Sequence, residues 1–94
     1  MSERDAGICP LCEQRGEIGA ACGHNAICQK RELHFIPLEY FDRLRDTKPN
    51  DRPAYIGETI DDYLLVGLLG EGGFGQVYRA LQLPLLMPAA MKLL

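Results

Sequence analysis

Four cysteines lie within the first 28 residues and carry the clearest chemical signal in the chain. Cys9 and Cys12 form a C-x2-C pair, and Cys22 and Cys28 follow at longer spacing. A C-x2-C pair bends the backbone so that two thiolates can meet one metal ion, and zinc takes four nitrogen or sulfur ligands in a tetrahedron. The spacing therefore predicts one structural Zn2+ held by the four cysteines, with His24 as the substitute for Cys22 or Cys28.

Three other states of these cysteines are compatible with the sequence. Cysteine packs as a small apolar residue, so four buried free thiols are one alternative. Two disulfides would form in an oxidising compartment, whereas a redox-active C-x2-C pair would need a strand–helix context that the sequence lacks. We favour a metal site because residues 1–36 contain too few apolar side chains to order the segment without a cross-link. His34, six residues beyond Cys28, is a weaker ligand candidate.

The cysteine spacing is also similar to the first half of a RING finger, but no cysteine follows Cys28. A cross-braced domain with two metal ions therefore cannot form. A zinc-ribbon-like or knuckle module with a single site is the closer resemblance. Such modules serve protein contact, nucleic-acid contact or structure, and the absence of a basic patch argues against nucleic acid. The resemblance thus implies a structural role or a protein partner.

A glycine-rich motif, GEGGFG at residues 70–75, matches the pattern G-x-G-x-x-G. The residues that follow, 76–79, are typical of a strand, so the motif joins two strands. A dinucleotide-binding loop would instead open a helix, and a P-loop would continue with Gly-Lys-Ser or Gly-Lys-Thr. Glycines in a hairpin let the backbone come close to phosphate oxygens, where a Cβ atom would intrude. The motif therefore indicates a phosphate-binding hairpin, the alternative being a glycine-rich turn that binds nothing.

Two further features follow the motif: Val77 directly after the loop, and Ala89-Ala90-Met91-Lys92 as the next strand. This order matches the glycine-rich loop and the V-A-I-K strand of protein kinases. Residues 57–94 resemble the beginning of the N-terminal lobe of a bacterial serine/threonine protein kinase of the eukaryotic-like type.

The resemblance implies that ATP with Mg2+ is the cofactor of the parent kinase. In that family Phe74 would cap the phosphates, and Lys92 would hold the α- and β-phosphates. Leu69, Val77 and Ala90 would form the apolar roof over the adenine ring. The implied nucleotide-binding residues are Leu69, Gly70, Glu71, Gly72, Gly73, Phe74, Gly75, Gln76, Val77, Ala90 and Lys92.

The 94 residues contain neither an H-R-D-x-x-x-x-N catalytic loop nor a D-F-G metal ligand. We therefore expect no catalytic residue in this chain and no activity of the chain alone. Transfer of the ATP γ-phosphate to a protein serine or threonine is the expected activity of the parent, whose protein substrate the sequence does not indicate. The alternative is a non-enzymatic zinc-binding interaction module that retains a relic of a kinase hairpin.

The elements expected to position these residues divide the chain into three parts. Residues 1–36 form the cysteine module, 37–60 a helix and linker, and 61–94 the truncated kinase lobe. Apolar spacing predicts a short helix over Leu38–Asp46. Three strands, expected to pair antiparallel, are predicted at Tyr63–Leu69, Gln76–Ala80 and Ala89–Leu94. The expected fold class is α+β.

The apolar link between the last two expected strands, residues 81–88, is atypical of the kinase family and predicts a surface that packs on a partner or on the rest of the kinase. Composition excludes other classes of function. The net charge is −3, and the three parts each carry −1, so no basic patch suits nucleic acid or an anionic membrane. The longest apolar stretch, Leu83–Met91, contains two prolines and is far shorter than the ~20 residues of a spanning helix. The polar N-terminus has no secretory signal, so we expect a cytoplasmic protein.

Overall fold

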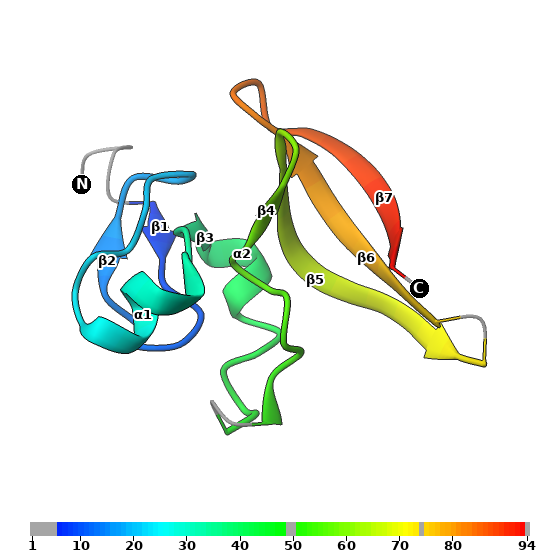
Figure 1. Ribbon diagram of the computed structural model, residues 1–94, viewed down its shortest axis with the longest axis horizontal. Coiled ribbons are helices and arrows are strands. Elements are labelled where there is room, and N and C mark those ends of the chain that lie inside the picture. The colour runs from blue at the N-terminus through cyan, green and yellow to red at the C-terminus, as the bar shows by residue number, and fades with distance from the viewer. Residues whose placement is uncertain (1–5, 49–50, 74, 94) are drawn as a thin grey trace.

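The computed structural model describes residues 6–48, 51–73 and 75–93. In these ranges the chain forms two antiparallel sheets and two short helices, α1 and α2 (Figure 1). The first sheet has three strands in the order β2-β1-β3, and the second has four in the order β4-β5-β6-β7. The elements are β1 (Gly7–Ile8), β2 (Arg15–Gly16), α1 (Ala26–Arg31), β3 (Ile36–Pro37), α2 (Leu38–Phe41), β4 (Thr59–Ile60), β5 (Tyr63–Gly72), β6 (Gly75–Gln82) and β7 (Met87–Leu93).

The first sheet and α1 enclose the cysteines. Helix α1 begins after Asn25, whose side-chain oxygen accepts a hydrogen bond from the Cys28 amide at 2.9 Å. This contact caps the helix and fixes the position of a cysteine at the same time. The sheet is tight at Gly16, where a Cβ atom would overlap the ring of Phe35. Only glycine fits there, which explains one of the glycines in this part of the chain.

The predicted helix over Leu38–Asp46 is too long. Helix α2 ends at Phe41, and the chain continues in tighter turns, with Leu44 bonded to the Phe41 carbonyl and Thr47 to the Leu44 carbonyl. The Arg52 guanidinium donates to the carbonyls of Leu44 and Thr47 at 3.2 and 3.1 Å, which satisfies acceptors that a continuing helix would have used. The apolar spacing still reports burial correctly, because Phe41 and Leu44 are both buried.

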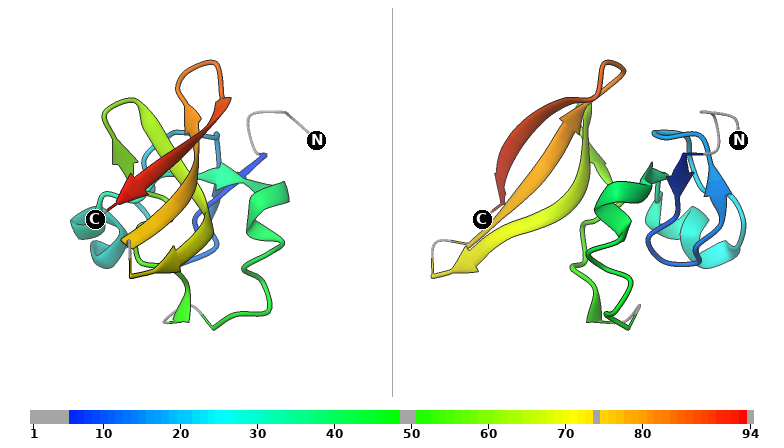
Figure 2. Two further views of the ribbon diagram at one scale, coloured as in Figure 1. Left: turned by 90° about the vertical axis from the view of Figure 1, so that its right-hand side faces the viewer. Right: turned by 180° about the vertical axis from the view of Figure 1, so that it is seen from behind.

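The second sheet contains the three predicted strands as β5, β6 and β7. It also contains β4, a fourth strand that the sequence analysis missed, which pairs with the beginning of β5. The pairing of β5 with β6 shifts register between Leu65 and Gly67 and again between Leu68 and Gly70. Such bulges increase the twist of the strand. Figure 2 shows that the long hairpin is strongly curved, and Figure 1 shows its β5–β6 turn on the far side of the sheet from the cysteine module.

One hydrophobic core joins the three parts of the chain. Helix α2 lies between the cysteine module and the four-stranded sheet (Figures 1 and 2). The module contributes Ile8 and Ile36 to the core, and the strands contribute residues such as Tyr78, which is fully buried. The buried members of this shared core are Ile8, Ile36, Phe41, Leu44, Ile56, Leu64, Leu65, Val66, Tyr78, Ala80 and Leu81.

Part of the apolar link before β7 packs on the chain itself. Leu83 and Leu86 are partly buried against the shared core, and the Leu83 side chain lies beside Gly19 of the cysteine module. Leu85 at the tip of the link remains 79% exposed. The chain therefore covers this apolar link only in part, and Pro84, Leu85, Met87 and Pro88 remain exposed. Neither helix of the described ranges is long and apolar enough to cross a membrane.

Candidate functional site

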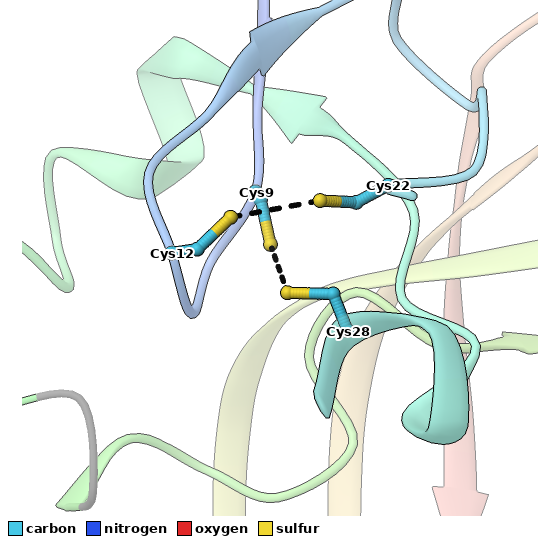
Figure 3. Close-up of side chains that lie close together, drawn as sticks. All are labelled: Cys9, Cys12, Cys22 and Cys28. Carbon is cyan, nitrogen blue, oxygen red and sulfur yellow. Dashed lines mark hydrogen bonds between the residues drawn. The ribbon is translucent and has the colours of Figure 1, made fainter. Parts of the chain in front are cut away.

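The four cysteines come together from three separate pieces of backbone (Figure 3). Cys9 and Cys12 lie on the turn between β1 and β2, Cys22 lies on the segment before α1, and Cys28 lies on α1 itself. All four side chains point toward one centre. Cys9, Cys22 and Cys28 are buried, and Cys12 is partly exposed. The sequence prediction of a four-cysteine cluster is confirmed.

The spacing of the sulfur atoms matches a tetrahedral zinc site. A Zn–S bond of about 2.3 Å implies about 3.8 Å between two sulfurs at the corners of a tetrahedron. The Sγ atoms of Cys9 and Cys28 are 3.7 Å apart, and those of Cys12 and Cys22 are 3.6 Å apart. All four sulfurs lie within 4.8 Å of one another, and all four residues are free cysteines. The cluster can therefore hold one metal ion with four protein ligands, the closed arrangement of structural zinc sites.

Backbone amides surround the sulfurs. The Leu11 amide donates to the Cys9 sulfur at 3.5 Å, as expected for a C-x2-C turn. Burial raises the pKa of Cys22 to about 11 and also raises the pKa of Cys28. Burial opposes ionisation of Cys12 as well, but hydrogen bonds from the Gln14 amide and neighbouring thiols leave its pKa below the usual value. Four thiolates are thus unfavourable without a cation, and a bound dication would supply the missing charge.

Neither histidine joins the cluster. His24, the predicted substitute ligand, is exposed and lies outside the group of ligand atoms that come together. His24 lies two residues after Cys22, and its backbone amide hydrogen-bonds to the Cys22 sulfur. The His34 amide donates to the Gly57 carbonyl, so this residue connects the module to the segment before β4. The candidate ligand set is therefore the four cysteines.

A nearly buried arginine holds the cysteine turn against the linker. The Arg52 guanidinium donates to the Pro10 carbonyl at 2.7 Å and lies 4.8 Å from the centre of the Phe41 ring. Its side chain is only 6% exposed. Pro10 also contacts Gly57, where an added Cβ atom would lie 2.7 Å from the proline Cγ. No local sequence pattern indicates the contact between Arg52 and Pro10, because the two residues are 42 positions apart.

The glycine-rich motif forms the turn between β5 and β6. Antiparallel pairing places Val77 opposite Lys92 and Arg79 opposite Ala90. Side chains alternate between the faces of a strand, so these four residues share one face of the sheet. Ala90 and Lys92 are exposed on this face, and Val77 is half-buried. Leu69, another predicted nucleotide contact, is 47% exposed at the second bulge of β5.

The opposite face carries a hydrogen-bonded chain of polar groups. The Tyr78 hydroxyl donates to the Gln76 side chain, and Gln76 in turn donates to the Glu71 carboxylate, both at 3.1 Å. Gln76 and Tyr78 alternate with Val77, so they lie on the other side of the sheet. The structure therefore separates Glu71 and Gln76 from the exposed face on which Val77, Ala90 and Lys92 meet. Their contact with each other stiffens the hairpin near its turn.

The glycines of the motif fall into two kinds. Gly75 has a φ angle of +104°, a backbone conformation that favours glycine. Gly70 and Gly73 have no positive φ angle, and an added Cβ atom would meet nothing within 4 Å at either position. The described part of the chain therefore gives no internal reason for glycine at 70 and 73. Phe74 lies outside the described residues.

Comparison with known proteins adds no assignment to this geometry. No protein-family model, no curated protein and no solved structure matches the chain. The chemistry available to it is that of its own side chains: a closed four-cysteine cluster that could hold one metal ion, and a curved glycine-rich hairpin with an exposed lysine-bearing face.

Proposed function

We propose that the chain is the N-terminal region of an ATP-dependent protein serine/threonine kinase, in which a structural zinc module supports the first strands of the nucleotide-binding lobe. The observation that carries the proposal is the register of β6 and β7, which pairs Val77 with Lys92. An apolar residue and a cation are thereby adjacent on one exposed face, as a roof over adenine and phosphates requires. Ala90 extends the apolar part of this face.

The unexplained glycines give a second line of support. Gly70 and Gly73 meet open space on their side-chain side, so their small size has no use in packing. A phosphate group close to the backbone would supply that use, because a Cβ atom would keep the phosphate oxygens away from the amide groups. A plain hairpin turn would require glycine only where φ is positive, as at Gly75.

The cysteine cluster fits a supporting role in this proposal. With four protein ligands and three of them buried, a bound Zn2+ would have no open position for substrate or water. Its effect would be to hold the β1–β2 turn, the segment around Cys22 and helix α1 together. Through Ile8 and Ile36 the folded module then completes the core on which the strands pack.

The proposal is tested by nuclear magnetic resonance titration of the zinc-loaded chain with Mg-ATP, adenosine and tripolyphosphate. Adenine in a kinase lies between two lobes and Mg2+ is held largely from the second lobe, so we expect millimolar rather than micromolar affinity. Shifts should concentrate at residues 70–77 and 90–92. Lys92→Ala should weaken the response to ATP and tripolyphosphate but spare the response to adenosine. Lys30→Ala, which removes an exposed charge from α1, is the matched control.

Each pattern of shifts has a definite meaning. Shifts on the Val77 and Lys92 face that depend on both adenine and phosphate support the proposal. Shifts scattered over the surface, or equal effects of the two lysine variants, contradict it. Either contradicting result would favour the alternative function, a zinc-binding protein-interaction module without nucleotide binding.

A further inference from the structure

A small cavity of about 150 Å³ lies between the α2 region and the second sheet. Tyr40 of α2 and Arg43 just beyond it form one side, and Arg79 of β6 lies opposite among residues of β5. Pro53 and Leu69 belong to the apolar part of the wall. The cavity is separate from the cysteine cluster, and among the described residues it shares only Leu69 with the predicted nucleotide contacts.

The charges around the cavity are unbalanced. Arg43 and Arg79 both line it, and no acidic residue among those that the structure describes does so. Neither arginine side chain forms a hydrogen bond or ion pair with any residue that the structure describes. The chain as a whole carries a net charge of −3, so a purely cationic cavity is not a consequence of its composition. Arg79 is half-buried, whereas Arg43 is exposed.

From these observations we propose that the cavity binds a small organic carboxylate with a compact apolar body. A guanidinium matches a carboxylate in two parallel hydrogen bonds, so Arg43 and Arg79 are suited to hold the anionic end. The remaining wall is mostly apolar, with Leu44, Val66 and Leu69 among its residues. An apolar cavity of about 150 Å³ is large enough for a six-carbon ring. Inorganic phosphate would pair with the arginine charges but would leave the apolar wall of the cavity without a contact.

Benzoate, benzyl alcohol and inorganic phosphate are the probes for this site. Each is titrated into the zinc-loaded chain and followed by nuclear magnetic resonance of the backbone amides. We expect benzoate to shift residues 66–69 and 79 and to bind more tightly than either other probe. Benzyl alcohol has the ring without the carboxylate, and phosphate has the charge without the ring. Comparing the three probes therefore separates the contribution of the anionic group from the contribution of the ring.

Three variants assign the binding to the cavity. Arg43→Gln and Arg79→Gln should each weaken benzoate binding about tenfold or more, since each removes a charge-assisted hydrogen bond. Arg45→Gln is the control, because Arg45 is 60% exposed and already pairs with Asp42 at 2.9 Å. It should leave benzoate affinity unchanged. Thermal unfolding of every variant identifies any that fails to fold.

The titrations of the parent chain and its variants can either support or overturn the proposed carboxylate site. Benzoate binding that is lost in both cavity variants and kept in the control supports the site. Equal binding of benzoate and benzyl alcohol would overturn the role of the arginines, and tighter binding of phosphate would overturn the role of the apolar wall. No benzoate shifts in a folded chain would overturn the proposal as a whole. Lys92→Ala should not affect benzoate, so failure here is distinguishable from failure of the nucleotide proposal.

Discussion

Removing the metal should unfold the four-stranded sheet as well as the cysteine module. The smaller hydrophobic cluster contains Cys9, Cys22, Cys28, Leu33 and Phe35, so candidate metal ligands make up most of its buried residues. Without a metal ion these thiols give up the bonds that hold three pieces of backbone together. We therefore expect chelation, or the variant Cys28→Ser, to unfold residues 6–37.

Unfolding of the module would remove two buried isoleucines from the core that it shares with the sheet. Ile8 and Ile36 are 6% and 0% exposed and pack with the strands. Burial of each isoleucine contributes about 1.5–3 kcal/mol, so losing both removes about 3–6 kcal/mol. Domains of this kind are stable by only about 5–15 kcal/mol in total. The sheet would therefore lose a large part of its stability, and the two regions should unfold in one transition.

The assay combines metal analysis with thermal unfolding. Protein purified without added zinc should contain about one equivalent of metal. A strong chelator should lower the melting temperature and abolish the dispersed amide signals of Leu65 and Tyr78 in the sheet. Cys28→Ser should behave like the chelated protein. His24→Ala should behave like the parent chain, because His24 is exposed and outside the cluster. A metal-free protein with an unchanged melting temperature and intact sheet signals would refute the reasoning.

Three other changes test the packing directly. Gly57→Ala should destabilise the fold by about 1–3 kcal/mol in urea unfolding, since φ is +94° and the new Cβ atom would meet Pro10 at 2.7 Å. Arg52→Met should cost about 2 kcal/mol or more through lost hydrogen bonds to buried carbonyls, whereas Arg45→Met at an exposed ion pair should cost under about 1 kcal/mol. Burial raises the pKa of Tyr78. The Tyr78 hydroxyl of the unfolded chain ionises near pH 10, whereas the folded chain keeps it protonated to a higher pH. The contribution of neutral Tyr78 to the free energy of unfolding is therefore present below about pH 10 and declines as pH rises. Tyr78→Phe should make this decline shallower.

The features predictable from sequence are those whose signal is local. The C-x2-C spacing of Cys9 and Cys12 fixes a turn of the backbone, and the scarcity of apolar residues around it indicates a metal site. The strands β5, β6 and β7 are marked by apolar and β-branched residues on either side of a glycine turn. Backbone geometry enforces both patterns within a few residues, so neither depends on distant contacts.

The features that sequence reasoning missed depend on contacts between distant residues. Helix α2 ends at Phe41 where Arg52 takes up the carbonyls beyond it, and that arginine also reaches Pro10. Strand β4 is only Thr59–Ile60, which is too short to show an alternating pattern. The cavity at Arg43 arises only when the α2 region packs beside β5 and β6, elements that are far apart in the chain.

The position of the cysteine module argues for a stabilising role in the proposed kinase lobe rather than a contact with nucleotide. A two-stranded hairpin is marginal in water, and independent stability needs three or more strands with a hydrophobic face, or packing against a helix. Here Ile8, Ile36 and Phe41 enter the same core as Tyr78 and Ala80. The opposite face carries Val77, Arg79, Ala90 and Lys92; the α2 region covers it beside Arg79, and Ala90 and Lys92 remain exposed. Zinc would thus affect nucleotide binding by stabilising the fold of the sheet. Loss of zinc should therefore weaken the binding of ATP and the binding of adenosine alike.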